Sequence, residues 1–176
     1  IGLVATLIAS AATAQTYPAK PVRVIVPFPP AGAADIVARH ASNALSEAFG
    51  VQFIVENRAG AGGNIGSDVV AKSPADGYTL LMNDLGGHCS APSLYSKLPY
   101  DAIKDFAPVM LVAGSPMVLI ANPVHNVRTL PQLIDLAKNK PGSLNYGSGG
   151  VGTTSHVTLE VFKSVTKTRI THVRSE

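Results

Sequence analysis

The stretch Val22-Arg23-Val24-Ile25-Val26-Pro27-Phe28-Pro29-Pro30-Ala31-Gly32-Ala33-Ala34-Asp35 decides the fold of this chain. Its opening residues are rich in valine and isoleucine, which predicts a strand buried on both faces. The prolines end that strand, because proline donates no hydrogen bond to a neighbouring strand. A helix is predicted from about Ala34 to Phe49, with Gly50 as its C-terminal cap. A tight loop between such a strand and a helix leaves backbone N–H groups available to an anion.

The same order of strand, glycine loop and helix is predicted twice more. Residues 52–56 form a short strand, and a glycine loop at 57–63 leads into a helix over 64–72, with Asn64 as its N-cap. A strand at 144–146 leads into a third glycine-rich loop and a helix that ends near residue 165. Together with the first loop they suggest one converging site for a small anion. Each loop alone is explained as simply by a turn.

The rest of the chain predicts further strands of an α/β fold. Residues 77–82 form a third apolar strand, so the first sheet is parallel, with ligands expected outside the carboxyl ends of its strands. Irregular chain follows from 91 to 108, then strands at 109–113 and 117–122. A helix starts after Thr129, its N-cap, and ends before Pro141, and residues 169–173 form a final strand.

Composition excludes several classes of protein. The chain has 176 residues, 46% hydrophobic and 14% charged, with a net charge of +3, which is typical of a globular protein. No cluster of Lys and Arg with interleaved aromatics occurs, so no nucleic-acid partner is expected. The single Cys89 excludes an internal disulfide; beside His88 it could be a nucleophile, but an idle thiol is the simpler interpretation. The five histidines show no ligand spacing, so neither metal nor cofactor is expected.

The first residues differ in kind from the rest. Ile1–Ala14 is uncharged, apolar and ends in Ala12-Thr13-Ala14, the small-x-small pattern of a signal-peptidase site. We therefore expect residues 1–14 to be the remnant of a signal peptide, with the mature protein starting near Gln15 in the periplasm. A buried N-terminal helix is the alternative.

Two motifs suggest rival functions. Gly147-x-Gly149-x-x-Gly152 matches the dinucleotide fingerprint, and Glu176 lies where a ribose-binding acid is expected. A dinucleotide-binding enzyme is therefore an alternative. Ser155 and His156 suggest a hydrolase only weakly, since neighbours on a helix point about 100° apart. No catalytic residue is assigned. Asp35 could be a catalytic carboxylate, but is better explained as favouring the helix start and orienting its loop.

Arg58 is the cation within the glycine loops. It could pair with a ligand carboxylate, or form an ion pair with Glu56 or Asp68. The sequence does not decide between these partners.

Several segments together resemble the tripartite tricarboxylate transporter substrate-binding proteins, also called the Bug family. Across nearly all of residues 17–173, the matching motifs are Tyr17-Pro18-x-Lys20-Pro21, residues 26–35, residues 56–66, Asp76-Gly77-Tyr78-Thr79-Leu80, Leu98-Pro99-Tyr100-Asp101, residues 104–109, Asn145-Tyr146-Gly147-Ser148 and Thr153-Thr154-Ser155-His156. The resemblance implies a two-lobed α/β fold like that of periplasmic binding proteins, a Venus flytrap with parallel sheets flanked by helices. It places lobe one at 17–116, a crossover or hinge at 117–123 and a partial lobe two at 124–176.

The resemblance also implies a periplasmic, non-catalytic receptor that binds a small carboxylate between its lobes, for transport or sensing. A monomer is expected, and a membrane permease is a candidate partner. One jaw comprises Phe28, Ala31, Gly32, Ala33 and Asp35, acting mostly through backbone N–H groups, and the other comprises Ser148, Gly149, Thr153, Thr154 and Ser155. Asp84 and His88 lie in the segment that tends to contact the far end of the ligand.

Two departures from the family pattern stand out. Ala31 replaces the usual glycine, which could alter the conformation of the loop. After His172 and Val173 the family continues with a Pro-Tyr-Lys-Gly-like segment, whereas this chain has residues 174–176. We therefore expect an incomplete second lobe, and a non-functional remnant is a further alternative.

Overall fold

A computed structural model describes residues 16–174. The expected leader at residues 1–14 lies outside the described residues. The first lobe comprises β1 (Val22–Val26), α1 (Ala33–Phe49), β2 (Phe53–Asn57), η1 (Ala61–Gly63), α2 (Asn64–Ala71), β3 (Thr79–Leu81) and α3 (Leu85–Leu94). The second comprises η2 (Pro123–His125), α4 (Leu130–Asn139), β4 (Asn145–Ser148), α5 (Thr154–Thr166) and β5 (Thr171–Arg174). In the part described, every helix is too short or too polar to cross a membrane.

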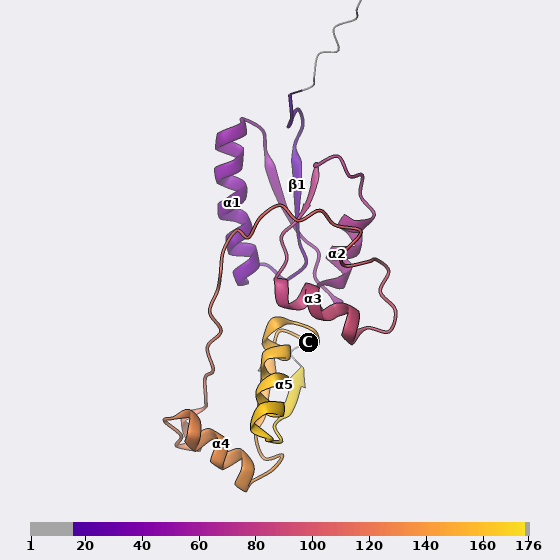
Figure 1. Cartoon of the computed structure of the whole chain (residues 1–176). Coiled ribbons are helices and arrows are strands. Elements are labelled where there is room, and N and C mark those ends of the chain that lie inside the picture. The colour runs from indigo at the N-terminus through magenta and orange to yellow at the C-terminus, as the bar shows by residue number, and fades with distance from the viewer. Residues whose placement is uncertain (1–15, 175–176) are drawn as a thin grey trace, which may run out of the picture.

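The first lobe is built on a parallel sheet with strand order β2-β1-β3. Because the chain passes from β1 to one neighbour and then to the other, α1 and α2 cover opposite faces, as Figure 1 shows. On one face of β1, Val22 and Val26 are fully buried and Ala38 of α1 packs against them; on the other face, Ile25 is fully buried as well, which confirms the strand predicted as buried on both faces. α3 lies across the carboxyl ends of the strands (Figure 1).

The second lobe is smaller. β4 and β5 form a parallel pair in which Ser148 lies opposite Arg174. Its core consists of Ala137, Leu144 and Ile170, which are 0 to 7% exposed. The predicted cap of α4 is confirmed, since the hydroxyl of Thr129 accepts a hydrogen bond from the backbone N–H of Gln132 at 3.4 Å. From residue 129 onward, the predicted strands and helices of the second lobe agree with the structure to within about two residues.

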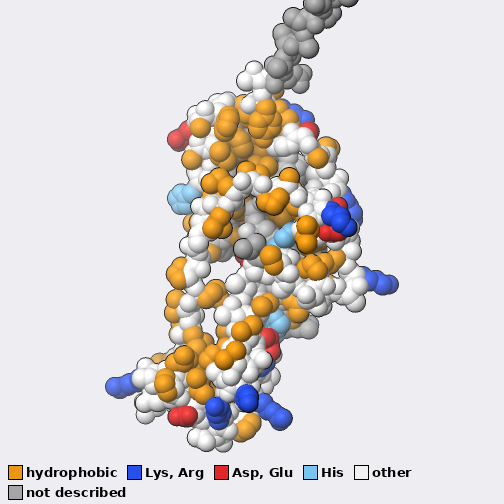
Figure 2. All heavy atoms as spheres, in the orientation of Figure 1, with side chains coloured by type: hydrophobic (Ala, Val, Ile, Leu, Met, Phe, Trp, Pro, Cys, Tyr) orange, Lys and Arg blue, Asp and Glu red, His pale blue; other side chains and the backbone are white. Residues whose placement is uncertain are grey.

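The predicted strands at 109–113 and 117–122 are wrong. Residues 106–122 contain neither helix nor strand. They run as an extended connection between the lobes, and Figure 2 shows orange hydrophobic side chains along it. Leu111 is 78% and Ile120 85% exposed. A strand requires a neighbour for its backbone hydrogen bonds, and no described strand pairs with either segment.

Two local predictions also need correction. Gly63, at a φ of 98°, is the N-cap of α2, and Asn64 is the first helical residue. The side-chain oxygen of Asn64 instead accepts the Tyr100 hydroxyl at 2.7 Å. The sequence did not predict α3, because Gly86, Gly87 and Pro92 lower its helix propensity. Its packing explains both glycines: a Cβ added to Gly86 would lie 2.5 Å from the hydroxyl of Thr154 in α5, and one added to Gly87 would lie 3.0 Å from the carboxylate of Asp84.

Candidate functional site

The first glycine loop is held by Asp35. Its carboxylate is 3% exposed and accepts the backbone N–H of Ala31 at 2.9 Å and the side-chain amide of Asn57 at 2.9 Å. Arg39 donates to it at 3.0 Å, and this hydrogen bond, then those from Ala31 and Asn57, lowers the pKa of Asp35 to about 2. Asp35 therefore orients the loop, as its position in the first turn of the helix suggested, and its oxygens are already engaged.

Ala31 keeps the glycine-like conformation of its loop. Its φ is 66°, in the left-handed region that a residue with a Cβ adopts at a cost of about 1–2 kcal/mol. The hydrogen bond from its N–H to Asp35 holds it there. Alanine at this position therefore adopts the left-handed conformation that glycine favours. Ala31, Gly32 and Ala33 are exposed, and no side chain caps α1.

The second glycine loop lies against the first. A Cβ added to Gly63 would lie 3.5 Å from the ring of Phe28, and one added to Gly66 would lie 2.7 Å from Pro27. Arg58, left open by the sequence, pairs with Glu56 at 3.2 Å. Of the partners considered for Arg58, which were a ligand carboxylate, Glu56 and Asp68, the structure shows an ion pair with Glu56.

The third glycine loop gathers hydroxyl groups. The Thr153 hydroxyl donates to the Gly150 carbonyl at 2.8 Å and lies 3.1 Å from the Ser155 hydroxyl, which accepts the Gly149 N–H at 3.3 Å. Ser148 lies 2.7 Å from the Nε2 of His172. No side chain caps the N-terminus of α5. The loop thus combines hydroxyl groups with the first-turn N–H groups of a helix.

Helix α3 joins the second and third loops. The Asp84 carboxylate accepts the Thr154 hydroxyl at 2.6 Å, and the Tyr95 hydroxyl contacts the Ala61 carbonyl at 3.0 Å and the Val151 carbonyl at 3.2 Å. Ser90 donates to the Gly152 carbonyl at 3.3 Å. The first loop thus contacts the second, and the second contacts the third directly and through α3.

The two residues predicted for the far end of the ligand have other partners here. Asp84 caps α3 by accepting the Gly87 N–H, besides binding Thr154. The ring nitrogens of His88 contact the Asn83 amide at 3.3 Å and the Ala102 carbonyl at 2.9 Å. His88 therefore holds the following loop in place. Its neighbour Cys89 is an exposed free thiol.

Sequence reasoning missed Tyr95, Ser90 and His172. Tyr95 and Ser90 connect loops that lie 34 to 62 residues away in sequence, so no local pattern identifies them. His172 contacts Ser148 because β4 and β5 pair in parallel. The contact between His172 and Ser148 could have been predicted only from the register of β4 and β5, and that register depends on the tertiary structure.

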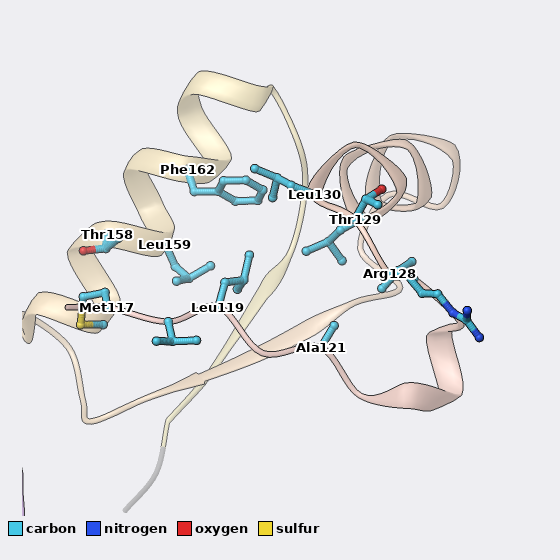
Figure 3. A pocket seen from close by; sticks show the side chains of 12 residues that line it. Met117, Leu119, Ala121, Arg128, Thr129, Leu130, Thr158, Leu159 and Phe162 are labelled. Carbon is cyan, nitrogen blue, oxygen red and sulfur yellow. The ribbon is translucent and has the colours of Figure 1, made fainter.

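Two hollows found within residues 16–174 are described here, and neither is formed by the predicted jaws. The larger, of about 510 Å³, lies in the second lobe. Figure 3 shows Leu119, Leu159 and Phe162 among the side chains that line it. The smaller, of about 300 Å³, lies behind the second loop beside Tyr95. The side chains that line the larger hollow are mainly apolar, as expected for a core surface that no other segment covers. Within residues 16–174 no group of His, Cys, Asp and Glu is placed to hold a metal.

The chain is similar to known solute receptors. Residues 37–175 match the model of the tripartite tricarboxylate transporter family receptor. Protein BugT of Bordetella pertussis is 42% identical over 161 residues, which are 89% of this chain and 48% of that protein. An uncharacterised relative from Pseudomonas is 39% identical over 175 residues, 98% of this chain and 52% of its own length. The chain spans about half the length of the curated relatives it matches.

Solved structures are similar as well. Rpa4515 of R. palustris with adipate has a TM-score of 0.85 and 37% identity, over 90% of this chain and 53% of that chain. MatC of Rhodopseudomonas palustris with bound malate has a TM-score of 0.82 and 31% identity, over 90% of this chain and 54% of that chain. The fold is therefore that of the periplasmic binding proteins, as the sequence predicted.

Proposed function

Because the chain belongs to the tripartite tricarboxylate transporter receptor family, whose members are periplasmic solute receptors and not enzymes, we propose that it captures a small carboxylate between its first and third glycine loops. The alternative of a dinucleotide-dependent enzyme is therefore discarded. The observation that carries the proposal is the matched pair of helix starts at these loops. Neither α1 nor α5 has a side-chain cap, so their first-turn N–H groups are available to an anion.

The two jaws contribute differently to binding. The first offers the backbone of Ala31, Gly32 and Ala33, held in place by Asp35. The second adds the hydroxyls of Ser148 and Ser155 next to the start of α5. Phe28 supplies an apolar wall, half-buried against the second loop. Backbone N–H groups and hydroxyls bind a carboxylate with charge-assisted hydrogen bonds, which are stronger than neutral ones.

The wider setting follows from the same family membership. Adipate is bound to one relative and malate to another, which supports a carboxylate as the class of ligand. We propose that the protein works outside the cytoplasm, binds its ligand as a monomer between the two lobes, and passes it to a membrane permease. A hinge within residues 117–123 would let the lobes close. The boundaries 17–116 and 124–176 for the lobes belong to this proposal.

Titration calorimetry and thermal unfolding of the full chain against adipate, malate and related carboxylates test the proposal. A ligand at 100 times its dissociation constant raises the unfolding free energy by about 2.7 kcal/mol. Ser155→Ala removes a hydroxyl at the start of α5 and is expected to weaken binding about tenfold or more. Ser164→Ala, an exposed position on the same helix, is the matched control and should bind as the wild type does. The absence of any carboxylate effect on a chain that unfolds cooperatively would refute the proposal.

A further inference from the structure

We propose that His172 and His156 couple the capture of a carboxylate to the uptake of a proton, which His172 holds behind the hydroxyl of Ser148. The inference rests on the proposed function, because it adds a proton-binding group to the same site. Its starting observation is a hydrogen bond of 2.7 Å between the Ser148 hydroxyl and Nε2 of His172. Ser148 is one of the hydroxyls proposed to bind the ligand, so a titratable ring lies directly behind that site.

The protonation of His172 decides the direction of this hydrogen bond. A hydroxyl has one hydrogen to donate, and an unprotonated Nε2 accepts it, which leaves Ser148 no hydrogen for a ligand. When both ring nitrogens carry a proton, Nε2 donates to Ser148, and the hydroxyl hydrogen becomes available to a carboxylate. The Gly150 carbonyl, 3.3 Å from the same hydroxyl, is a weaker acceptor than a charged carboxylate. The cationic ring also places a positive charge near the anion.

A second ring, that of His156 in α5, faces His172. The two ring centroids are 4.6 Å apart and both side chains are half-buried. Two charged rings at this separation repel each other, so the pair holds one proton more readily than two. Nδ1 of His156 accepts the backbone N–H of Gly152 at 3.4 Å, and a nitrogen that accepts carries no proton. The proton of the pair therefore belongs to His172, the ring that contacts Ser148.

The other ionisable groups around the pair keep their charge state near neutral pH. Hydrogen bonds from Lys163, at 2.7 Å, and from Tyr146 lower the pKa of Glu160 below its ordinary value. Tyr146 stacks on His172 with ring centroids 4.8 Å apart, and burial, then Glu160, raises the pKa of Tyr146. α3 brings the carboxylate of Asp84 to the start of α5. Histidine is the residue type among these whose charge ordinarily changes between about pH 5 and 8.

Carboxylate binding and proton binding therefore favour each other. A carboxylate beside Ser148 stabilises the cationic form of His172, and by linkage the cationic form binds the carboxylate more tightly. The affinity for carboxylates is then highest at lower pH, where His172 is protonated. It falls as the pH rises and the proton is lost.

Titration calorimetry of the full chain with malate and adipate, in two buffers of different ionisation enthalpy, measures the protons taken up on binding. Between about pH 6.5 and 8.5 the ligands stay ionised, because an ordinary carboxyl group has a pKa near 4. His172→Gln is the test variant, since its side-chain amide offers an N–H donor to Ser148 but no charge. His40→Gln makes the same change at an exposed histidine of α1 and is the matched control.

The wild type and His40→Gln are expected to take up part of a proton per ligand, and to lose affinity about tenfold from about pH 6.5 to 8.5. His172→Gln is expected to bind with the same affinity at both pH values and to take up no proton. The wild-type measurement needs no variant, so it tests the inference even if His172→Gln fails to fold.

Binding by the wild type without proton uptake, or an uptake that a cooperatively unfolding His172→Gln retains, overturns the inference and leaves the proposed function intact. If no carboxylate binds the wild type at either pH, the proposed function fails and the inference fails with it.

Discussion

Gly66→Ala is expected to destabilise the protein, although alanine favours helices more than glycine does. Gly66 lies within α2, where the substitution alone would add about 1 kcal/mol of stability. The structure leaves no room for the methyl group. It would lie 2.7 Å from Pro27 Cβ, 2.8 Å from Pro27 Cα and 2.9 Å from the carbonyl oxygen of Arg58. These atoms belong to backbone and to a fully buried ring, so none can turn aside.

The size of the effect follows from these two opposing contributions. Overpacking of a close-packed site costs about 1–3 kcal/mol, and three contacts with rigid groups place this site at the upper end. Subtracting the gain in helix propensity leaves a net loss of about 2 kcal/mol. For a chain of this length the melting temperature would fall by about 4–8 °C. Because Pro27 opens the first glycine loop, carboxylate affinity should fall as well.

Thermal and urea unfolding of the variant measure the effect. Gly147→Ala is the matched control, since no atom lies within 4 Å of the added Cβ and its backbone needs no left-handed conformation. The control is expected to unfold like the wild type. If Gly66→Ala were instead more stable by the amount that helix propensity alone predicts, α2 would not pack on Pro27 as described, and the close contact of the first two loops would be wrong.

Two further predictions concern Ala31 in the first loop and the carboxylates of Asp35 and Glu56. Ala31→Gly should raise the unfolding free energy by about 0.5 kcal/mol, because relief of the left-handed φ of 66° outweighs the extra freedom of glycine in the unfolded chain. The control Ala38→Gly, within α1, should lower the unfolding free energy. Urea unfolding midpoints of the two variants measure this, and equal losses for both would contradict the strain at Ala31. Asp35 and Glu56 have pKa values lowered to about 2, so the stability they contribute is present above about pH 4 and is lost as the pH falls toward 2. Urea unfolding of Asp35→Asn at several pH values should show a weaker acid dependence than the wild type, and an identical dependence would argue against this role.

Much of the first lobe was predictable because its signals are local. The buried strand 22–26, the proline-rich turn and the amphipathic helix to Phe49 each follow from residues within a few positions of one another. The role of Asp35 was also predictable, since a carboxylate four residues after Ala31 reaches the loop across one helical turn. Where a residue's partner lies nearby in sequence, the physical chemistry of the segment already determines the contact.

The remaining parts needed partners from elsewhere in the chain. The segments at 109–113 and 117–122 have the composition of strands, yet without a neighbouring strand they stay extended and exposed. α3 has a sequence that disfavours a helix, and it forms because Asp84 caps it and its glycines allow close packing on α5. Asp84 and Thr154, which the resemblance assigned to separate parts of the ligand site, also contact each other, and no local pattern shows that contact.

The sequence by itself determined the α/β class, the strand and loop order of the first lobe, and the family whose receptors bind carboxylates. Only the tertiary structure decided that α3 joins the glycine loops, that His88 is occupied, and that Asp84 lies at the start of α5. The physical reason is range. Backbone propensity and capping act within about a turn of chain, whereas the charge and hydrogen bonds of this site join residues up to 70 positions apart, and their meeting depends on how the lobes pack.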